Sequence, residues 1–262
     1  MPDVSPLPLS AAATPSILAV LAMVGFLAGL VDSIAGGGGL LTVPALMAAG
    51  LPPHVVLGTN KGQAVFGAIS SLTSFWRRGY VDRDRVPISF SLSFAGAIVG
   101  AEIVFAIHPA HLQPIVLVLL VAAAVVVMLR RPIEPTAALA KNPRLALAAL
   151  AFGMGAYDGF FGPGTGSLLI VGNALLFGDT LTRASGNAKV TNLASNVAAV
   201  ALFAYGGKIL WQVALPMAAA NVIGAFVGAR LAVRRGDRFV RAVVLMVVLA
   251  LVVKLAVDLV RP

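Results

Sequence analysis

Two glycine-rich tracts are the residues of this sequence best suited to bind a small anion. They read Gly36-Gly-Gly-Gly39 and Gly162-Pro-Gly-Thr-Gly166, and each opens a short apolar segment. A helix that starts at such a tract presents backbone amides without helical partners, together with the positive end of its dipole. The alternative is that the glycines only let helices pack closely. Because two tracts occur, we favour the binding site, whose candidate residues are Gly36, Gly37, Gly38, Gly39, Gly164, Thr165 and Gly166.

Polar side chains recur at helical spacing after each tract. The second tract is followed by a stripe from Ser185 to Asn196, whose polar residues share one face of a helix. A similar stripe from Thr59 to Ser74 follows the first. A lysine inside a bilayer costs about 2.5 to 3.5 kcal/mol, so the lysine in each stripe should face a cavity or a partner, unless it reaches the membrane interface. The candidate substrate-binding residues here are Thr59, Asn60, Lys61, Gln63, Asn187, Lys189, Asn192 and Asn196.

An aspartate closes the helix before each tract, at Asp32 and Asp158. A carboxylate at that depth can carry a proton and couple proton movement to transport. It can also cap the amides of the tract, or pair with a lysine. Capping is the simplest of these roles, and both aspartates remain candidates for proton coupling.

Composition places the chain in a membrane. It is 59% hydrophobic and 11% charged, and its charges gather in short clusters between apolar runs long enough to cross a bilayer. The net charge of +9 is explained by Lys and Arg that anchor cytoplasmic loops, so nucleic acid is not an expected partner. With no cysteine and three histidines, we expect no metal site and no cofactor.

The expected fold is an all-α integral membrane protein. The segments that begin at the tracts, 40–50 and 167–178, are short: a helix over 40–50 spans about 16 Å, and the hydrocarbon core is about 30 Å thick. Each reaches about halfway and should form a re-entrant hairpin with the helix before it. Full-length helices are expected at 15–35, 54–76, 86–107, 111–129, 142–161, 182–205, 211–232 and 239–260.

The two halves of the chain repeat each other at an offset of 128 residues. Lys61 aligns with Lys189, and Gly58 aligns with Gly186. Glycine and lysine matching at one common spacing indicates duplication, because an apolar composition alone would not produce it.

Charge indicates how the two copies are oriented. The loop 77–85 carries four arginines whereas its counterpart, 206–208, carries one basic residue, so equivalent loops should face opposite sides of the membrane. We therefore predict two inverted-topology repeats, each a re-entrant hairpin followed by three transmembrane helices. The basic loops, including 230–241, should be cytoplasmic and both termini extracytoplasmic. The expected units are a tail at 1–14, a repeat at 15–130, a basic cytoplasmic linker at 131–142 and a repeat at 143–262.

The tracts and the lysine motifs together resemble the TauE/SafE sulfite exporter family. The resemblance rests on the sequence from Gly29 to Pro44 with Gly58-Thr-Asn-Lys61, and on their repetition in the second half, and it covers essentially the whole chain. The chain departs from the family pattern where proline and threonine interrupt the second tract, and where Asn187 stands in place of threonine.

The resemblance implies a secondary transporter that exports sulfite or an organosulfonate across the bacterial inner membrane, coupled to protons. Its expected partners are the anion, protons and membrane lipid, and a homodimer is a candidate assembly. From the residues, we expect an oxyanion held near the midplane by half-helix amides, polar stripes and lysines, and exposed alternately to each side.

Two other functions compete with alternating access. An anion channel would use the same residues. An intramembrane enzyme with re-entrant hairpins is less favoured, because a serine nucleophile needs a base within reach and the three histidines fall at predicted loop positions.

Overall fold

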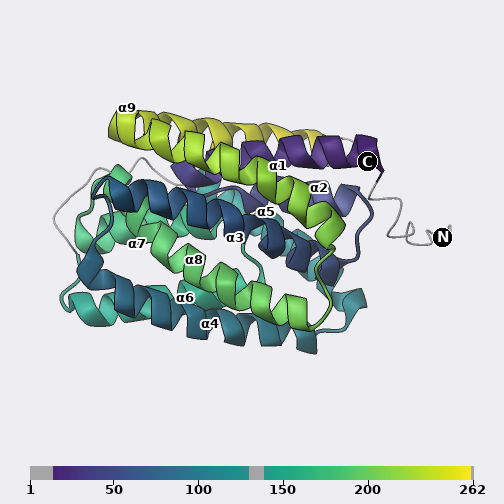
Figure 1. Cartoon of the computed structure of the whole chain (residues 1–262), viewed down its shortest axis with the longest axis horizontal. Coiled ribbons are helices and arrows are strands. Elements are labelled where there is room, and N and C mark those ends of the chain that lie inside the picture. The colour runs from purple at the N-terminus through teal and green to yellow at the C-terminus, as the bar shows by residue number, and fades with distance from the viewer. Residues whose placement is uncertain (1–13, 130–138, 261–262) are drawn as a thin grey trace.

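The computed structural model describes residues 14–129 and 139–260, with side chains given for 14–123, 125–126 and 139–235. Of the expected tail at 1–14, residues 1–13 lie outside the described residues, and so do residues 131–138 of the expected linker. The described part of the chain consists of helices that run mostly along the long axis of the molecule, without strands (Figure 1).

The helices follow the expected order closely, with two short ones that open at the glycine tracts. Their bounds are α1 (Pro15–Ala35), α2 (Gly39–Ala48), α3 (Pro53–Arg77), the 3-10 helix η2 (Arg83–Arg85), α4 (Val86–Ala106), α5 (Pro109–Leu129), α6 (Pro143–Phe160), α7 (Thr165–Phe177), α8 (Leu181–Tyr205) and α9 (Trp211–Val260). The all-α architecture is thus confirmed for the described residues.

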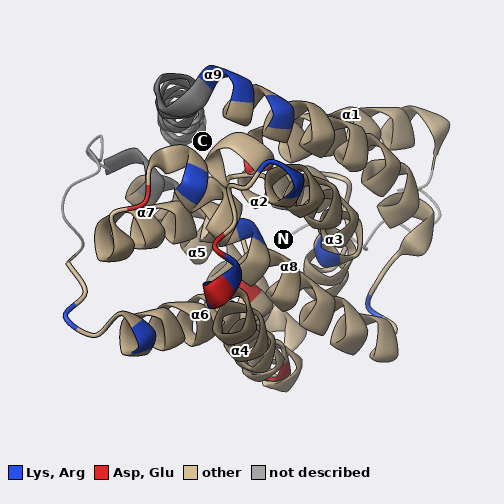
Figure 2. Cartoon of the chain, turned by 60° about the vertical axis from the view of Figure 1, so that its left-hand side comes forward, with Lys and Arg blue, Asp and Glu red and all other residues tan. Residues whose placement is uncertain are grey.

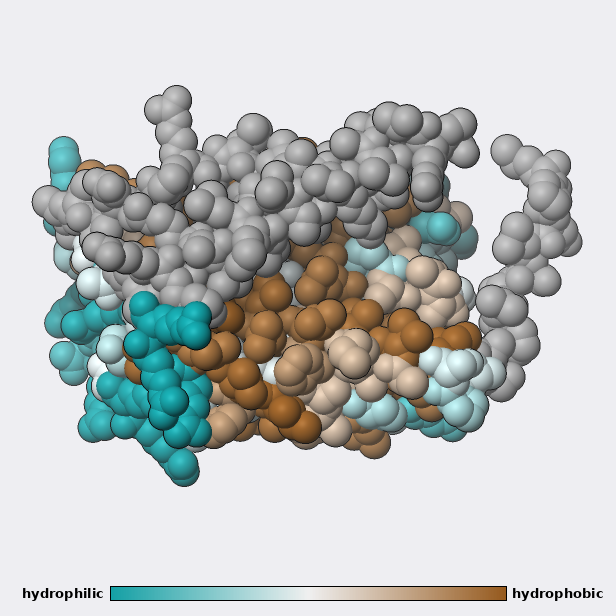
Figure 3. Space-filling model, turned by 90° about the horizontal axis from the view of Figure 1, so that it is seen from above, coloured by the Kyte–Doolittle hydropathy of each residue, from teal (hydrophilic) through white to brown (hydrophobic). Residues whose placement is uncertain are grey.

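Three stretches in the described residues are long and apolar enough to cross a membrane: Pro15–Ala35, Arg83–Ala106 and Trp211–Arg235. Helices α3 and α8 are longer than most but carry the polar stripes, whose side chains are buried inside the protein rather than turned to lipid. Figure 3 shows a band of hydrophobic side chains between more hydrophilic ends, as expected for a membrane-embedded protein.

The expected loop at 230–241 is wrong, because α9 continues through it as a helix of 50 residues. This segment contains no proline and a single glycine, and its other residues are compatible with a helix, so nothing in the sequence ends the helix there. Figure 1 shows α9 bending, so that its C-terminal end returns to the end of the molecule at which it begins. The chain therefore reverses without the expected loop.

The two halves of the chain interlock. Helix α1 packs along α9 and α4 packs along α6, so each half contributes one helix to each pair. In the first pair Gly224 lies against the carbonyl of Phe26, and in the second Gly96 lies against the carbonyl of Phe152; a methyl group at either glycine would overlap that carbonyl. Close packing through glycine therefore recurs at positions that match in the repeat.

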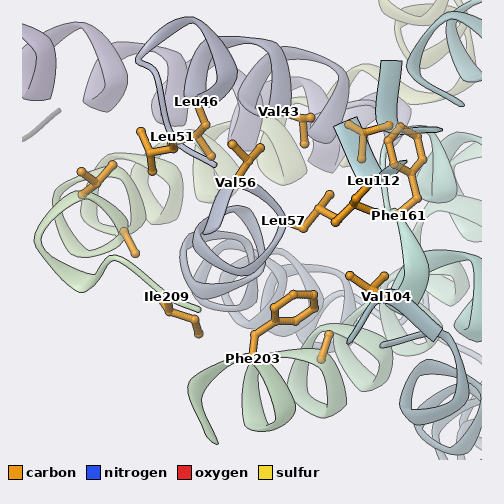
Figure 4. Packing of buried hydrophobic residues seen from close by; sticks show 14 of the residues in the cluster. Val43, Leu46, Leu51, Val56, Leu57, Val104, Leu112, Phe161, Phe203 and Ile209 are labelled. Atoms are coloured by element: carbon orange, nitrogen blue, oxygen red, sulfur yellow. The ribbon is translucent and has the colours of Figure 1, made fainter. Parts of the chain in front are cut away.

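An apolar cluster fills the end of the molecule at which α1 begins. Leu46, Leu51, Val56, Phe203 and Ile209 are among its buried members, contributed by α2, α3, α8 and the segments next to them (Figure 4). The opposite end holds the basic residues between α3 and α4, at the start of α6 and in α9 (Figure 2). The two ends thus differ in chemistry although the helices around them match.

Candidate functional site

The two glycine tracts meet inside the protein. The amide of Ser167 donates to the carbonyl of Gly36 over 2.9 Å, and the Ser167 hydroxyl donates to the carbonyl of Ala35 over 2.5 Å. A methyl group added at Gly36 would overlap the backbone of Gly166. Gly36 and Gly164 also have φ values of 76° and 85°, a left-handed conformation that glycine adopts without steric cost. Glycine is required here both by the contact and by the backbone.

A small cavity lies between the tracts, with about 450 Å³ of empty space. Helices α2 and α7 both begin at its wall, and the polar stripes of α3 and α8 line it. Of the candidate residues, those that line it are Asp32, Gly36, Gly38, Gly39, Asn60, Lys61, Gln63, Asp158, Gly164, Gly166, Asn192 and Asn196. Residues from both halves of the chain are thus brought to one place.

Backbone amides at the two helix starts are open to this cavity. Within the described part of the chain, the amides of Gly39 and Gly166 have no hydrogen-bond acceptor, and both residues line the cavity. These are among the first amides of α2 and α7, where a helix leaves its donors unsatisfied. The cavity therefore offers anion-binding donors from two helix starts.

Each lysine forms an ion pair with an aspartate of the other half. Lys61 Nζ lies 2.8 Å from Asp158 Oδ1, and Lys189 Nζ lies 2.6 Å from Asp32 Oδ2. Lys189 also donates to the Asp32 carbonyl over 2.5 Å. Both lysines are buried, with side chains 3% and 0% exposed, so the alternative that they extend to the membrane interface is wrong.

The aspartates combine the two structural roles that the sequence indicated. Besides its lysine, Asp32 accepts a hydrogen bond from the amide of Gly38 over 3.4 Å, and so caps the tract. Asp158 accepts one from the hydroxyl of Ser195 over 2.5 Å. The Asp32 side chain is 27% exposed and the Asp158 side chain only 3%, so Asp32 is the more open of the two to the cavity.

Pairing makes the site close to neutral. Two lysines and two aspartates cancel in formal charge, so neither ammonium group is free to attract an anion in this conformation. What remains is a wall of partial positive charge from the two helix starts. An anion bound here would rely first on backbone amides, and on a lysine only if its aspartate were neutralised.

A chain of hydrogen bonds ties the first polar stripe to α9. Asn221 donates to Gln63 Oε1 over 2.7 Å, and Gln63 donates to Asn60 Oδ1 over 3.3 Å. Thr42 of the short helix α2 also donates to Asn60 Oδ1, over 2.5 Å. These contacts fix one wall of the cavity.

Five candidate residues do not line the cavity. The Thr59 hydroxyl accepts from the amide of Leu210, and the Thr165 hydroxyl donates to the carbonyl of Gly162, so each stabilises a helix start. Asn187 accepts from the amide of Asp82 over 2.7 Å, near the basic end of the molecule. Lys189 reaches the cavity only through Asp32, and Gly37 lies behind the lining residues.

Asn221 and Gly162 line the cavity and were not among the candidates. Asn221 is 5% exposed and stands in an otherwise apolar stretch of α9, and a buried amide in such a helix was a usable signal. Gly29 and Gly67 make room for it, since a methyl group at either would overlap Asn221. A methyl group at Gly162 would lie 2.9 Å from Lys61 Nζ, so that glycine lets the Lys61 pair approach the tract.

Charged residues form a network at the basic end of the molecule. Arg85 lies 2.8 Å from Asp179 Oδ2 and 3.2 Å from Asp82 Oδ2. Arg183 lies 3.3 Å from Asp82 and 3.6 Å from Asp179, and Asn187 donates to Asp179 over 2.8 Å. We call these four charged residues and Asn187 the end network. It links the segment before α4 to the start of α8, across the two halves.

Comparison with known proteins points to transport. The family model described as sulfite exporter TauE/SafE matches residues 21–255. The probable membrane transporter protein ORF9 of a Sinorhizobium species is 37% identical over 248 residues, covering 94% of this chain and 95% of that protein. The probable membrane transporter protein YfcA of Escherichia coli K12 is 37% identical over 246 residues, covering 94% and 91%. A probable membrane transporter protein of Haemophilus influenzae is 37% identical over 248 residues, covering 92% and 95%.

No solved structure matches the chain. The family description and the names of the relatives indicate a membrane transporter rather than an enzyme.

Proposed function

The chain belongs to the sulfite exporter TauE/SafE family, and from this membership we propose that it is a secondary transporter that exports sulfite or an organosulfonate across the bacterial inner membrane. The observation that carries the proposal is the cavity at which two helix starts and two crossed lysine–aspartate pairs converge. Sulfite and sulfonates are compact oxyanions whose oxygens accept several hydrogen bonds at once. The amides of Gly39 and Gly166 are donors of the kind that such oxygens need.

Proton coupling follows from the ion pairs. Protonation of Asp32 or Asp158 would remove the negative charge that holds Lys189 or Lys61, and leave an ammonium group at or next to the cavity. The site would then change from neutral to positive, and an anion would bind more tightly. Release of the proton would restore the pair and expel the anion. Binding of the anion and of the proton therefore support each other.

An inverted repeat would supply the two states that such a cycle needs. Two contacts support it, because they match at the offset of 128: Gly58 lies against the carbonyl of Lys208, and Gly186 lies against the carbonyl of Tyr80. Each contact joins a stripe helix of one half to the loop before the last helices of the other. In an inverted arrangement these two contacts would lie at opposite ends, and movement of one half against the other would open one as it closes the other.

The two ends of the path would close by different chemistry. One end holds the end network of Asp82, Arg85, Asp179 and Arg183. The residues 128 positions from these four are Leu210, Val213, Leu51 and Val55, all within or against the apolar cluster at the other end. Ion pairs would therefore close one side and apolar packing the other.

The orientation in the membrane follows from charge. Because basic residues favour the cytoplasmic side, the end with the end network faces the cytoplasm. Helix α1 begins and α9 ends at the opposite end of the molecule (Figure 1), which places both termini outside the cell.

Flux in proteoliposomes tests the proposal. Purified protein would be reconstituted, and efflux of sulfite and of a sulfonate measured with and without a pH gradient, for the wild type and for Lys61→Ala and Lys189→Ala. We expect flux that depends on the gradient in the wild type and its loss in both variants. Unchanged flux in both variants would remove the lysines from the mechanism, and gradient-independent wild-type flux with channel-like rates would favour an anion channel.

A further inference from the structure

A groove on the outer surface of the protein is separate from the cavity. It lies between the last turns of α3 and the middle of α9, and has about 930 Å³ of empty space. Its apolar wall consists of Phe66, Ile69, Val222 and Phe226, and its other end carries Arg77 and Arg78. None of these residues takes part in the proposed transport site.

The apolar wall is open along the membrane-facing side. The side chains of Phe66, Ile69 and Phe226 are 38%, 47% and 46% exposed. The hydroxyls in the groove do not offer free polar groups to it, since Ser70 donates to the carbonyl of Val222 and Thr73 donates to the carbonyl of Ile69. A hydrocarbon chain is the occupant that this part of the groove fits.

The basic end of the groove lacks a protein counterion. Within the described residues, Arg77 and Arg78 form no ion pair, whereas Arg85 in the same segment pairs with two aspartates. Arg230, one turn beyond Phe226 on α9, lies 5.8 Å over the Phe226 ring and also forms no ion pair there. Three guanidinium groups thus lie near one end of an apolar groove. Such an end suits a phosphate diester, which arginine binds through paired hydrogen bonds.

The matching position in the other half lacks this chemistry. Counting 128 residues from Arg77, Arg78 and Arg230 gives Tyr205, Gly206 and Glu102. The arginines are therefore not a by-product of the duplication, because the sequence has changed one groove and not the other.

We propose that this groove binds one anionic phospholipid, with its headgroup phosphate on Arg77, Arg78 and Arg230 and an acyl chain along Phe66, Ile69 and Phe226. This is a site for a bound lipid rather than for the transported anion. A lipid held between α3 and α9 would stabilise a contact between the two halves of the chain, since α3 carries the first polar stripe and α9 carries Asn221.

The test compares lipid binding in detergent. Full-length protein would be stripped of lipid, and binding of phosphatidylglycerol and of phosphatidylcholine measured by native mass spectrometry, together with the thermal shift that each lipid causes. We expect the wild type to prefer phosphatidylglycerol, and Arg77→Gln/Arg78→Gln to lose about fivefold of that preference for each arginine removed. Arg144→Gln, at an exposed basic residue at the start of α6, is the matched control and should keep the preference.

A second variant tests the apolar part. Ile69→Trp fills the groove without changing charge, and should reduce binding of both lipids at this site. Equal binding of the two lipids by the wild type, or an unchanged preference in the double arginine variant, would overturn the proposal. The chain has no cysteine, so Ile69→Cys can be cross-linked alone; efficient cross-linking between two copies in lipid would show that a second copy covers the groove, and would also overturn it.

Discussion

The most consequential residues are two lysines that the fold buries completely. Each is held by an aspartate from the other half of the chain, so the pairs connect the halves as well as lining or adjoining the cavity. Removing one partner of a buried pair leaves an uncompensated charge, which typically costs about 3–5 kcal/mol. This makes each pair a point at which stability and transport are coupled.

Lys61→Ala should therefore lower both sulfite flux and thermal stability, because Asp158 would remain buried without its counterion. Lys61→Ala/Asp158→Ala should recover stability, since neither charge is left, but should not recover flux. Thermal unfolding and proteoliposome flux measure the two effects separately. Lys141→Ala, at an exposed lysine, should change neither. Recovery of flux in the double variant would show that the pair is only structural.

Asp32→Asn should uncouple transport from protons. Asparagine keeps an oxygen that can accept from Lys189 but cannot gain or lose a proton, so sulfite flux should no longer rise when a pH gradient is applied. The comparison is Asp84→Asn, at an exposed aspartate of η2, which should respond to the gradient like the wild type. If Asp32→Asn also responded normally, Asp32 would not be the coupling group.

Residue types and spacing predicted the members of the site better than their roles. Lys61 and Lys189 were found because a lysine in an apolar segment needs a partner, yet their partners came from the other half of the chain, which no spacing within one helix can indicate. Thr59 and Asn187 were selected from motifs and instead cap backbone amides outside the cavity. Asn221 was missed because it stands alone, without a stripe around it.

At the scale of elements, the short helices α2 and α7 matter because their starting tracts touch. Gly36 combines a left-handed backbone with contact against Gly166, so any side chain there would strain the backbone and separate the tracts.

Gly36→Ala should abolish sulfite flux and lower the midpoint of thermal unfolding, because both the backbone conformation and the contact are lost. Gly153→Ala is the matched control: Gly153 lies in α6 with open space around its Cα, and alanine is favoured over glycine in a helix by about 0.5–1 kcal/mol. Flux close to that of the wild type in a folded Gly36→Ala variant would contradict the requirement for contact between the tracts.

A second pair of variants tests how helices pack. Gly159→Ala on α6 would push a methyl group against the carbonyl of Ala97 on α4, and should destabilise the protein, whereas Gly153→Ala on the same helix should not. Thermal unfolding in one detergent compares them directly. Equal midpoints would mean that α4 and α6 can separate without cost.

Helix positions were largely predictable from the sequence, because apolar runs bounded by glycine, proline and charge set them locally. The loop expected at 230–241 was not, because basic residues alone do not end a helix; α9 continues through them. A positive cluster indicates the side of a membrane but not the backbone conformation.

The whole molecule presents two unlike ends around one central cavity. Matching positions carry the end network at one end and apolar residues at the other, so the duplicated chain is no longer symmetric in how it closes. The repeat could be read from the sequence, but this difference became visible only when the contacting residues were known. The crossed pairing of α1 with α9 and of α4 with α6 was equally hidden, since it depends on which surfaces meet.

Weakening the end network should open that side. Asp179 is 5% exposed and contacts Arg85, Arg183 and Asn187, so Asp179→Asn removes the charge that holds both arginines. In a background with Asn192→Cys in the cavity, a membrane-impermeant maleimide should react faster from the basic side in the Asp179→Asn variant. Asp84→Asn again serves as control. The absence of natural cysteines makes the reaction specific, and an unchanged rate would mean that the network does not close the path.

The central claim is that an oxyanion occupies the cavity between the two tracts, and crystallography with selenite tests it most directly. Selenite has the shape and charge of sulfite, and its selenium atom can be located by anomalous scattering. We predict an anomalous peak in the cavity, within hydrogen-bonding distance of the amides of Gly39 and Gly166 and lost in Gly36→Ala. Selenite bound elsewhere, with only water between the tracts of a protein that transports it, would contradict the account.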